Sequence, residues 1–178
     1  MTSIVSKDVL QTLKTARRAV RPGAGLGAGL VAALLAAMPA AHADPGAFSG
    51  YAGHWSGNGT ITIANAGTER IRCKGTYTVN NGGNTLQLAL RCASDSYRFD
   101  LNSEVTAYGE NLNGSWTESS RNVSGQVSGR VSGGQVAALV QTNGYAANFS
   151  ISTRGSRQSV HVTSKGDLRE VSISLTKG

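Results

Sequence analysis

IRCKGTYTVNNGGNTLQLALRC, residues 71–92, is the stretch that decides the fold of this chain. Apolar and polar residues alternate on both sides of Gly82-Gly83, which predicts two antiparallel strands joined by a turn at these glycines. In the register that keeps the apolar residues on one face, Cys73 lies directly opposite Cys92. These are the only two cysteines of the chain, so we expect a disulfide that links the two strands.

The same period of two runs from residue 55 to residue 175, in ten short segments separated by turn residues such as Asn143-Gly144. We therefore predict an all-β fold, an antiparallel up-and-down meander of about ten strands. A meander leaves two unpaired edges unless its last strand meets its first, so a closed barrel is favoured over the alternative, a two-sheet sandwich. Several glycines, Gly125 among them, fall on the inward face, where they either let a strand coil or open a cavity.

The first 43 residues have the pattern of a signal peptide. Basic residues precede an apolar run at 29–38, and Ala41-His42-Ala43 then supplies a small-x-small cleavage site. The run is too short to span a bilayer. A membrane-anchoring helix is the alternative, and the route of export, general or twin-arginine, stays open. We expect residues 44–178 to form a single β-barrel domain that begins with a flexible lead-in at 44–52.

The charge of the chain comes largely from this leader. The net charge is +7, but five of the 17 basic residues and one of the 10 acidic residues lie in residues 1–43, which leaves +3 after cleavage. A nucleic-acid partner is therefore not expected, nor is a membrane span after cleavage. Export also suits a disulfide, because disulfides persist in oxidising compartments. The predicted location is periplasmic or secreted.

Gly53-His54-Trp55, at the start of the first strand, resembles the Gly-x-Trp entrance of lipocalins and of the wider calycin group. That resemblance implies a secreted up-and-down barrel that holds a small apolar ligand. It also implies that Trp55 packs across the closed end of the barrel beneath a basic residue from the last strand, a role open to Lys177. The residues alone favour a solvated terminal side chain for Lys177.

The chain also departs from the lipocalin pattern. We count ten strands where lipocalins have eight, and we find neither their later Thr-Asp-Tyr-type motif nor their flanking helix. Fatty-acid-binding proteins have ten strands, but they cap the barrel with two helices after the first strand. The turn at Asn65-Ala66-Gly67 leaves no space for such a lid.

The candidate ligand-binding residues are the inward aromatic side chains and one charged pair, all assigned from strand parity. Glu118 and Arg121 face each other across a turn at a strand end, where an ion pair at the hairpin tip is favoured over a polar clamp for a ligand head group. The full set of candidate lumen residues is Trp55, Tyr77, Tyr97, Phe99, Trp116, Glu118, Arg121 and Phe149.

Catalysis and metal binding have little support in this sequence. His54 and His161 both fall on the outward face, and no serine, histidine and acid converge in the strand pattern. The two cysteines are expected to bind each other, so they are not metal ligands. The sequence therefore predicts no enzyme activity and no cofactor.

Two functions stay open. The first is a barrel that binds a small apolar or amphipathic ligand in its lumen. The second is a protein-interaction barrel with a filled interior, such as a periplasmic hydrolase inhibitor. A connected interior cavity of roughly 300 Å³ or more would favour the first, and a solid core would favour the second. The identity of the ligand or partner and the oligomeric state stay open.

Overall fold

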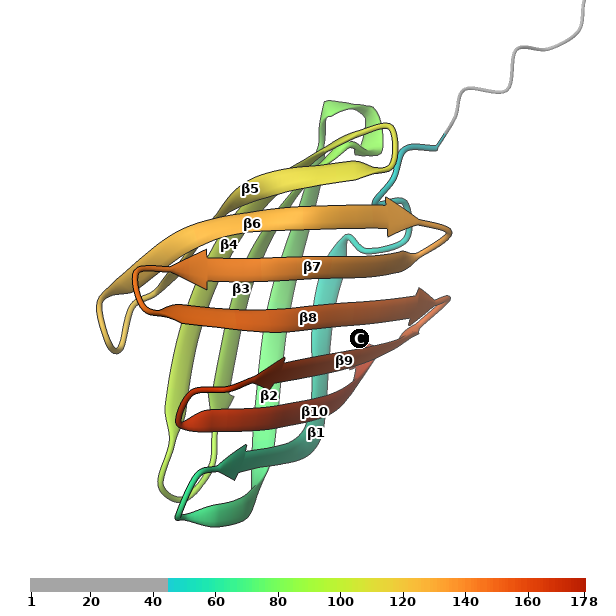
Figure 1. Cartoon of the computed structure of the whole chain (residues 1–178). Coiled ribbons are helices and arrows are strands. Elements are labelled where there is room, and N and C mark those ends of the chain that lie inside the picture. Colours follow the sequence, from blue (N-terminus) through green and yellow to red (C-terminus); the bar gives the residue numbers. More distant parts are fainter. Residues whose placement is uncertain (1–44) are drawn as a thin grey trace, which may run out of the picture. The chain divides into compact units, whose positions relative to one another are not determined.

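The computed structural model describes residues 45–178, and in that range it contains ten β-strands and one short 3-10 helix (Figure 1). The signal peptide expected at residues 1–43 lies outside the described residues. The elements in chain order are β1 (Gly53–Ile63), β2 (Gly67–Asn80), η1 (Asn81–Gly83), β3 (Thr85–Ala93), β4 (Arg98–Tyr108), β5 (Asn111–Glu118), β6 (Val123–Ser132), β7 (Gln135–Thr142), β8 (Tyr145–Arg154), β9 (Arg157–Ser164) and β10 (Leu168–Lys177).

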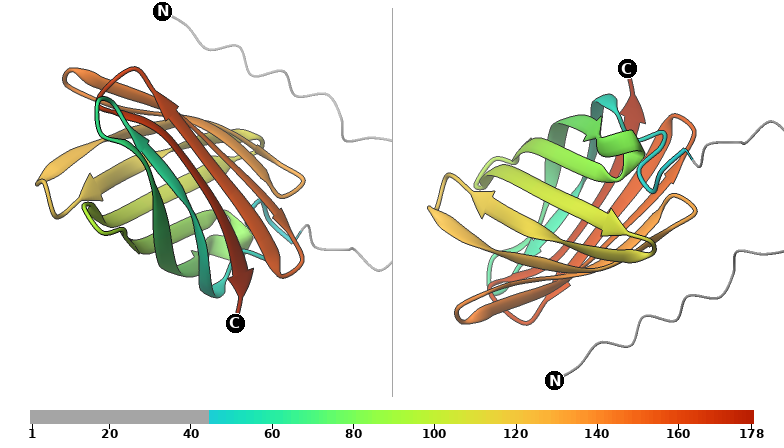
Figure 2. Two further views of the ribbon diagram at one scale, coloured as in Figure 1. Left: turned by 90° about the horizontal axis from the view of Figure 1, so that it is seen from below. Right: turned by 90° about the horizontal axis from the view of Figure 1, so that it is seen from above.

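The ten strands form a closed antiparallel barrel, and this confirms the predicted fold class. Each strand pairs with its neighbours in the chain, and β10 returns to pair with β1 along Trp55–Ile63. Figure 2 shows the strands following one another around a single continuous wall. The sandwich alternative is wrong, because a sandwich would leave strand edges that this ring of pairs does not have.

The hairpin of β2 and β3 has the register that the sequence predicts. Cys73 pairs with Cys92, Tyr77 with Leu88 and Gly75 with Leu90. The two sulfur atoms are bonded at 2.07 Å, so the disulfide links neighbouring strands. Residues that alternate toward the interior along these strands are buried, whereas the alternate polar residues are exposed. The turn at Gly82-Gly83 and the apolar periodicity together were therefore sufficient to predict this register.

Except at Gly75, the inward glycines of the strands allow close approach of the backbones and do not open space. A Cβ atom at Gly125 would lie 1.9 Å from the carbonyl oxygen of Gln141, and one at Gly57 would lie 1.9 Å from the carbonyl oxygen of Ser174. No side chain fits at those distances. The glycines therefore let neighbouring strands coil tightly around the barrel, which is the first of the two roles considered for them.

The segment before β1 plugs one end of the barrel, so the predicted flexible lead-in is wrong for residues 45–52. Phe48 and Tyr51 are completely buried. The backbone N–H of Phe48 donates to the carbonyl of Gly83 at 2.9 Å, and the Tyr51 hydroxyl donates to the carbonyl of Gly134 at 3.1 Å. The segment is ordered because two aromatic rings gain burial over the end of an otherwise open barrel.

Candidate functional site

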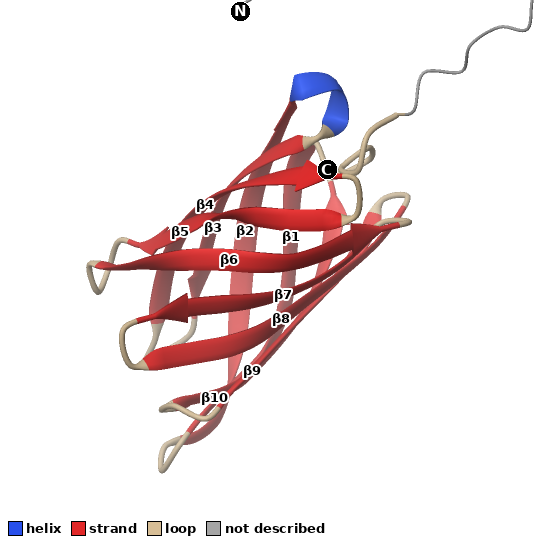
Figure 3. Cartoon of the chain, turned by 45° about the horizontal axis from the view of Figure 1, so that its top comes forward, coloured by secondary structure: helices blue, strands red, loops and turns tan. Residues whose placement is uncertain are grey.

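The two ends of the barrel are built differently. The closed end holds the 45–52 segment, the short helix η1 and the turns that follow β4, β6 and β8; η1 is the blue element in Figure 3. The mouth is the opposite end, formed by the turns that follow β1, β3, β5, β7 and β9. Any ligand that enters the interior therefore has its path through the mouth.

Trp55 packs across the closed end, as the lipocalin resemblance implies. Its indole N–H donates to the carbonyl of Tyr51 at 2.8 Å. The ammonium of Lys177, from the last strand, lies 5.7 Å from the centroid of the Trp55 ring and donates to the carbonyl of Gly50 at 3.3 Å. The favoured interpretation of Lys177 as a solvated terminal side chain is therefore wrong, because β1 supplies a ring and the segment before it supplies a carbonyl that contact the ammonium.

A buried hydrogen-bond chain completes the closed end. The Tyr77 hydroxyl donates to Oε1 of Gln158 at 2.6 Å, and Nε2 of Gln158 donates to the Thr153 hydroxyl at 2.9 Å. Burial raises the pKa of Tyr77 far above its ordinary value, with a smaller contribution from Tyr51, so the phenol stays protonated and available as a donor. These polar groups are hydrogen-bonded to one another within the packed closed end.

Above this plug the barrel is hollow. A connected cavity of about 650 Å³ extends from the plug to the mouth. This exceeds the roughly 300 Å³ that separates a ligand-binding barrel from a filled one. Its wall is almost entirely apolar; the lining includes Leu86, Leu88, Leu90, Leu101, Val105, Leu112, Val127, Val136, Val140, Ile151, Val160, Val162 and Ile173.

A second hollow, of about 830 Å³, lies on the outer wall across β1, β2, β3, β4 and β10. Charged side chains line it, among them Arg72, Lys74, Arg91 and Arg98. It is a broad depression open to solvent, so it does not surround a ligand as the interior cavity does. We therefore take the interior cavity as the candidate site.

Six of the eight candidate lumen residues line the cavity, and two do not. Trp55 and Tyr77 point into the barrel, but they lie in the packed closed end, where both are nearly fully buried. Strand parity reports the direction of a side chain and not its depth along the barrel, so it did not separate these two from the others. The residues in contact with the cavity are Tyr97, Phe99, Trp116, Glu118, Arg121 and Phe149.

Three of these residues form a layered contact at the mouth. The rings of Tyr97 and Phe99, two residues apart on one face of the chain, stack with their centroids 6.5 Å apart. The guanidinium carbon of Arg121 lies 5.0 Å from the Phe99 centroid and 5.9 Å from the Tyr97 centroid. The arginine is thus held against two aromatic faces at the edge of the cavity.

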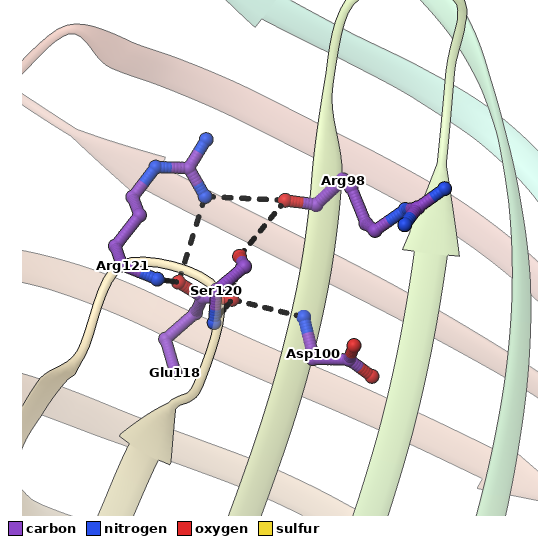
Figure 4. A network of polar contacts seen from close by, with 5 residues as sticks. All are labelled: Arg98, Asp100, Glu118, Ser120 and Arg121. Atoms are coloured by element: carbon purple, nitrogen blue, oxygen red, sulfur yellow. Dashed lines mark hydrogen bonds and ion pairs between the residues drawn. The ribbon is translucent and has the colours of Figure 1, made fainter.

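Glu118 holds the turn between β5 and β6 in place (Figure 4). Its Oε1 accepts the backbone N–H groups of Asp100 at 2.9 Å and Ser120 at 3.1 Å, together with the Ser120 hydroxyl. Its Oε2 accepts the backbone N–H of Arg121 at 2.9 Å. Burial alone would raise the pKa of Glu118, but these hydrogen bonds outweigh it and the net shift is downward. The carboxylate is therefore ionised at neutral pH, and both of its oxygens accept backbone hydrogen bonds.

The side chain of Arg121 makes only looser contacts with this turn. Its Nη1 lies 3.5 Å from Oε2 of Glu118 and donates to the carbonyl of Arg98 at 3.2 Å. The arginine side chain is 45% exposed, whereas that of Glu118 is 8% exposed. The favoured ion pair at a hairpin tip is present, but its two members have different environments. Glu118 is buried and accepts hydrogen bonds from backbone N–H groups, whereas Arg121 lies at the opening of the cavity.

Trp116 lies deeper in the wall. Its Nε1 atom is buried and has no hydrogen-bond partner among the described residues. The ring lies over Gly125, where an added Cβ would be 2.8 Å from Nε1. Trp116 also lines the cavity, so a ligand in the lumen would contact this ring.

The described residues contain no group of three or more His, Cys, Asp or Glu side chains that could hold a metal ion. His161 lies on the outer surface, where its Nδ1 is 3.8 Å from Glu170, and His54 contacts the Thr76 hydroxyl at 3.2 Å.

No helix in the part of the chain that the structure describes is long and apolar enough to cross a membrane. The cavity offers apolar surface, two stacked rings and one exposed cation.

The sequence interpretation missed three buried residues of the closed end: Phe48, Tyr51 and Gln158. Gln158 shares the inward parity of Val160, and a polar residue at an inward position was the available signal for a buried network. Phe48 and Tyr51 precede the first strand and follow no period of two, so no comparable signal for the plug exists in the sequence.

No family model and no curated protein matches this sequence. Among solved structures, the barrel is similar to the crystal structure of Rv2717c from M. tuberculosis, with a TM-score of 0.60, 12% identity, and coverage of 74% of this chain and 95% of that chain. It also matches the S-type phycobiliprotein lyase CPES from Guillardia theta, with a TM-score of 0.47, 11% identity, and coverage of 74% and 90%. The first likeness agrees with the closed antiparallel barrel that the strand pairing shows.

Proposed function

We propose that this protein binds a small apolar or amphipathic molecule inside its barrel. The observation that carries the proposal is the cavity of about 650 Å³, lined by aliphatic and aromatic side chains, between a packed closed end and the mouth. Ligand pockets of soluble proteins have volumes of roughly 300–1,000 Å³ and walls of this composition. The burial of apolar ligand surface against such a wall is the driving force for binding.

The proposed contacts are the six cavity-lining candidates. Tyr97, Phe99, Trp116 and Phe149 are each only partly buried although they face inward, so a ligand would cover apolar surface that they leave exposed. Val140 also lines the cavity and is only partly buried, so a larger side chain at this position would occupy part of the cavity. Trp55 and Tyr77 support the closed end and are not proposed as ligand contacts.

The test is a titration of the purified barrel with N-phenyl-1-naphthylamine, a neutral apolar dye whose emission rises when it leaves water. We expect saturable binding with one dye per barrel, accompanied by a change in tryptophan fluorescence that the substitution Trp116→Phe removes. Trp55 should not respond, because it is 1% exposed in the closed end.

A matched pair of substitutions on β7 separates lumen from surface. Val140→Trp places a large ring in the cavity and should weaken dye binding at least about tenfold. Gln141→Trp places the same ring on the exposed face one residue away and should leave binding within twofold. Thermal melts verify that both variants fold, and Leu101→Trp replaces Val140→Trp if the latter does not. Equal binding by the inward and outward variants would contradict a lumen site.

The alternative is a protein-interaction barrel, such as a periplasmic hydrolase inhibitor, which acts through its loops and needs no cavity. It gains support if the wild-type barrel binds neither the dye nor any amphiphile. The ligand-binding proposal makes no claim of catalysis.

We also propose that residues 1–43 are a signal peptide and that residues 44–178 function in the periplasm or outside the cell. The disulfide between Cys73 and Cys92 is compatible with an oxidising compartment. The intact mass of the exported protein should match a chain that begins at Asp44. A mass that retains residues before Ala41 would contradict cleavage.

A further inference from the structure

We infer that Arg121 recognises an anionic head group, so that the ligand class is a single-chain amphiphile carrying a carboxylate or a similar small anion. This inference rests on the proposed function and specifies it. Arg121 is the only lysine or arginine among the described residues that line the cavity. It lies at the mouth, so an apolar tail in the lumen would place its polar end at this guanidinium.

The charge of Arg121 is not consumed by its acidic neighbour. Both oxygens of Glu118 accept short hydrogen bonds from backbone N–H groups of Asp100, Ser120 and Arg121 itself, all at 2.9–3.1 Å. The guanidinium reaches the same carboxylate only at 3.5 Å. The carboxylate charge is therefore compensated mainly by main-chain dipoles, which leaves the guanidinium able to bind a second anion.

Arg121 has contacts that position it without a ligand. Its guanidinium carbon lies 5.0 Å from the Phe99 centroid and 5.9 Å from the Tyr97 centroid, and its Nη1 donates to the carbonyl of Arg98 at 3.2 Å. A guanidinium held in this way loses little conformational freedom when it binds an anion. Its 45% exposed surface is the part left to meet the ligand.

Other charges near the mouth bear on this inference. Asp167, in the turn between β9 and β10, also lines the cavity, and it would favour a cationic head group. Asp167 has no aromatic ring contact and no ion pair within the described residues, so it lacks the support that holds Arg121. We therefore expect the head group of the ligand to be selected by Arg121 and not by the exposed Asp167.

The experiment measures displacement of bound N-phenyl-1-naphthylamine by three amphiphiles with the same twelve-carbon chain: laurate, dodecanol and dodecylammonium. Laurate should compete about tenfold better than dodecanol in the wild type. Arg121→Gln should weaken laurate about tenfold and leave dodecanol and the dye within twofold. The turn should survive this change, because it is held by the main-chain N–H of residue 121 and not by its side chain.

Arg130→Gln is the matched control. Arg130 also lies 3.5 Å from a glutamate, Glu110, but on the outer surface and away from the cavity. This variant should bind all three amphiphiles as the wild type does. Arg121→Lys keeps the charge without the planar ring contact, and it should retain an intermediate preference for laurate.

Each outcome has a separate meaning. Failure of the dye itself to bind would overturn the proposed function. Dye binding with equal competition by laurate and dodecanol, or with equal losses for both in Arg121→Gln, would overturn only the role of Arg121. A preference for dodecylammonium that Asp167→Asn removes would assign the head group to the opposite charge and would likewise overturn the inference.

Discussion

Replacement of Glu118 by glutamine tests whether this carboxylate holds the mouth of the barrel. Glu118→Gln keeps the size of the side chain but converts one acceptor oxygen into an NH2 group. One of the two oxygens accepts the N–H groups of Asp100 and Ser120, and the other accepts the N–H of Arg121. Glutamine cannot accept at both positions, so at least one N–H loses its partner and faces another donor.

The expected loss follows from this count of hydrogen bonds. A polar group left unpaired costs about 1–3 kcal/mol, and the remaining bonds also lose the strength that a charged acceptor gives them. Partial access of water to the turn moderates the loss, so we expect Glu118→Gln to lower the free energy of unfolding by about 2 kcal/mol at neutral pH. The measurement is urea denaturation of the disulfide-intact barrel, monitored by far-UV circular dichroism.

Glu110→Gln is the control for this experiment. Glu110 is also paired with an arginine at 3.5 Å, but its side chain is 62% exposed. Such surface pairs contribute little, and this substitution should change the free energy of unfolding by less than about 0.5 kcal/mol. Equal losses of unfolding free energy in Glu118→Gln and Glu110→Gln would refute the conclusion that Glu118 stabilises the turn through backbone hydrogen bonds and not through its ion pair.

The pH dependence gives a second and independent test. The pKa of Glu118 is lower in the folded barrel than its ordinary value of 4.5, so the folded state favours the ionised form. Its contribution is present above the unfolded-state pKa and is lost as the pH falls through the lower folded-state pKa. The difference between wild type and Glu118→Gln should therefore be full at pH 6–7 and should shrink below about pH 4. A difference that grows on acidification would contradict the assigned direction.

Further substitutions test the strands, the closed end and the disulfide. Gly125→Ala should lower the free energy of unfolding by more than about 2 kcal/mol, because the new Cβ would lie 1.9 Å from a carbonyl oxygen. Gly75→Ala is the control: the nearest atoms to its Cβ would be side chains at 3.3 Å, so the free energy of unfolding should change by less than about 1 kcal/mol. Tyr77→Phe removes the donor to Gln158 and should cost about 1–2 kcal/mol in urea denaturation. Serine at both cysteines should cost about 3 kcal/mol, and the wild type should show no thiol reactive toward a maleimide before unfolding.

The register of the β2–β3 hairpin could be read from the sequence because one face of each strand is mainly apolar and Gly82-Gly83 marks the turn. A shift of one residue would bring Lys74 to the inside, and the turn position then selects the observed pairing of Cys73 with Cys92. Closure followed from the cost of unpaired edges. These features depend on local pattern, which a single sequence contains.

The position of each side chain along the barrel axis and the hydrogen-bond partners of each polar group could not be predicted from the alternation of apolar and polar residues. Tyr77 and Tyr97 have the same inward parity, yet the first is in the closed end and the second is at the mouth. That difference depends on strand stagger and on which end the segment with Phe48 plugs. The environment of Glu118 likewise depends on the N–H group of Asp100 in β4, a neighbouring strand, and no spacing in the sequence reveals that contact.

The closed end of the barrel is tightly packed, whereas the wall around the cavity leaves apolar surface uncovered. Phe48 and Tyr51 are completely buried there, whereas Phe99 and Phe149 around the cavity leave apolar surface uncovered. A ligand that binds only the folded barrel stabilises it by about 2.7 kcal/mol when present at one hundred times its Kd. Because Tyr77 does not line the cavity, the loss caused by Tyr77→Phe and the gain caused by ligand should add within about 0.5 kcal/mol. Strong non-additivity in urea denaturation with and without dye would mean that the ligand reaches the closed end, and the division between a structural plug and a binding cavity would then be wrong.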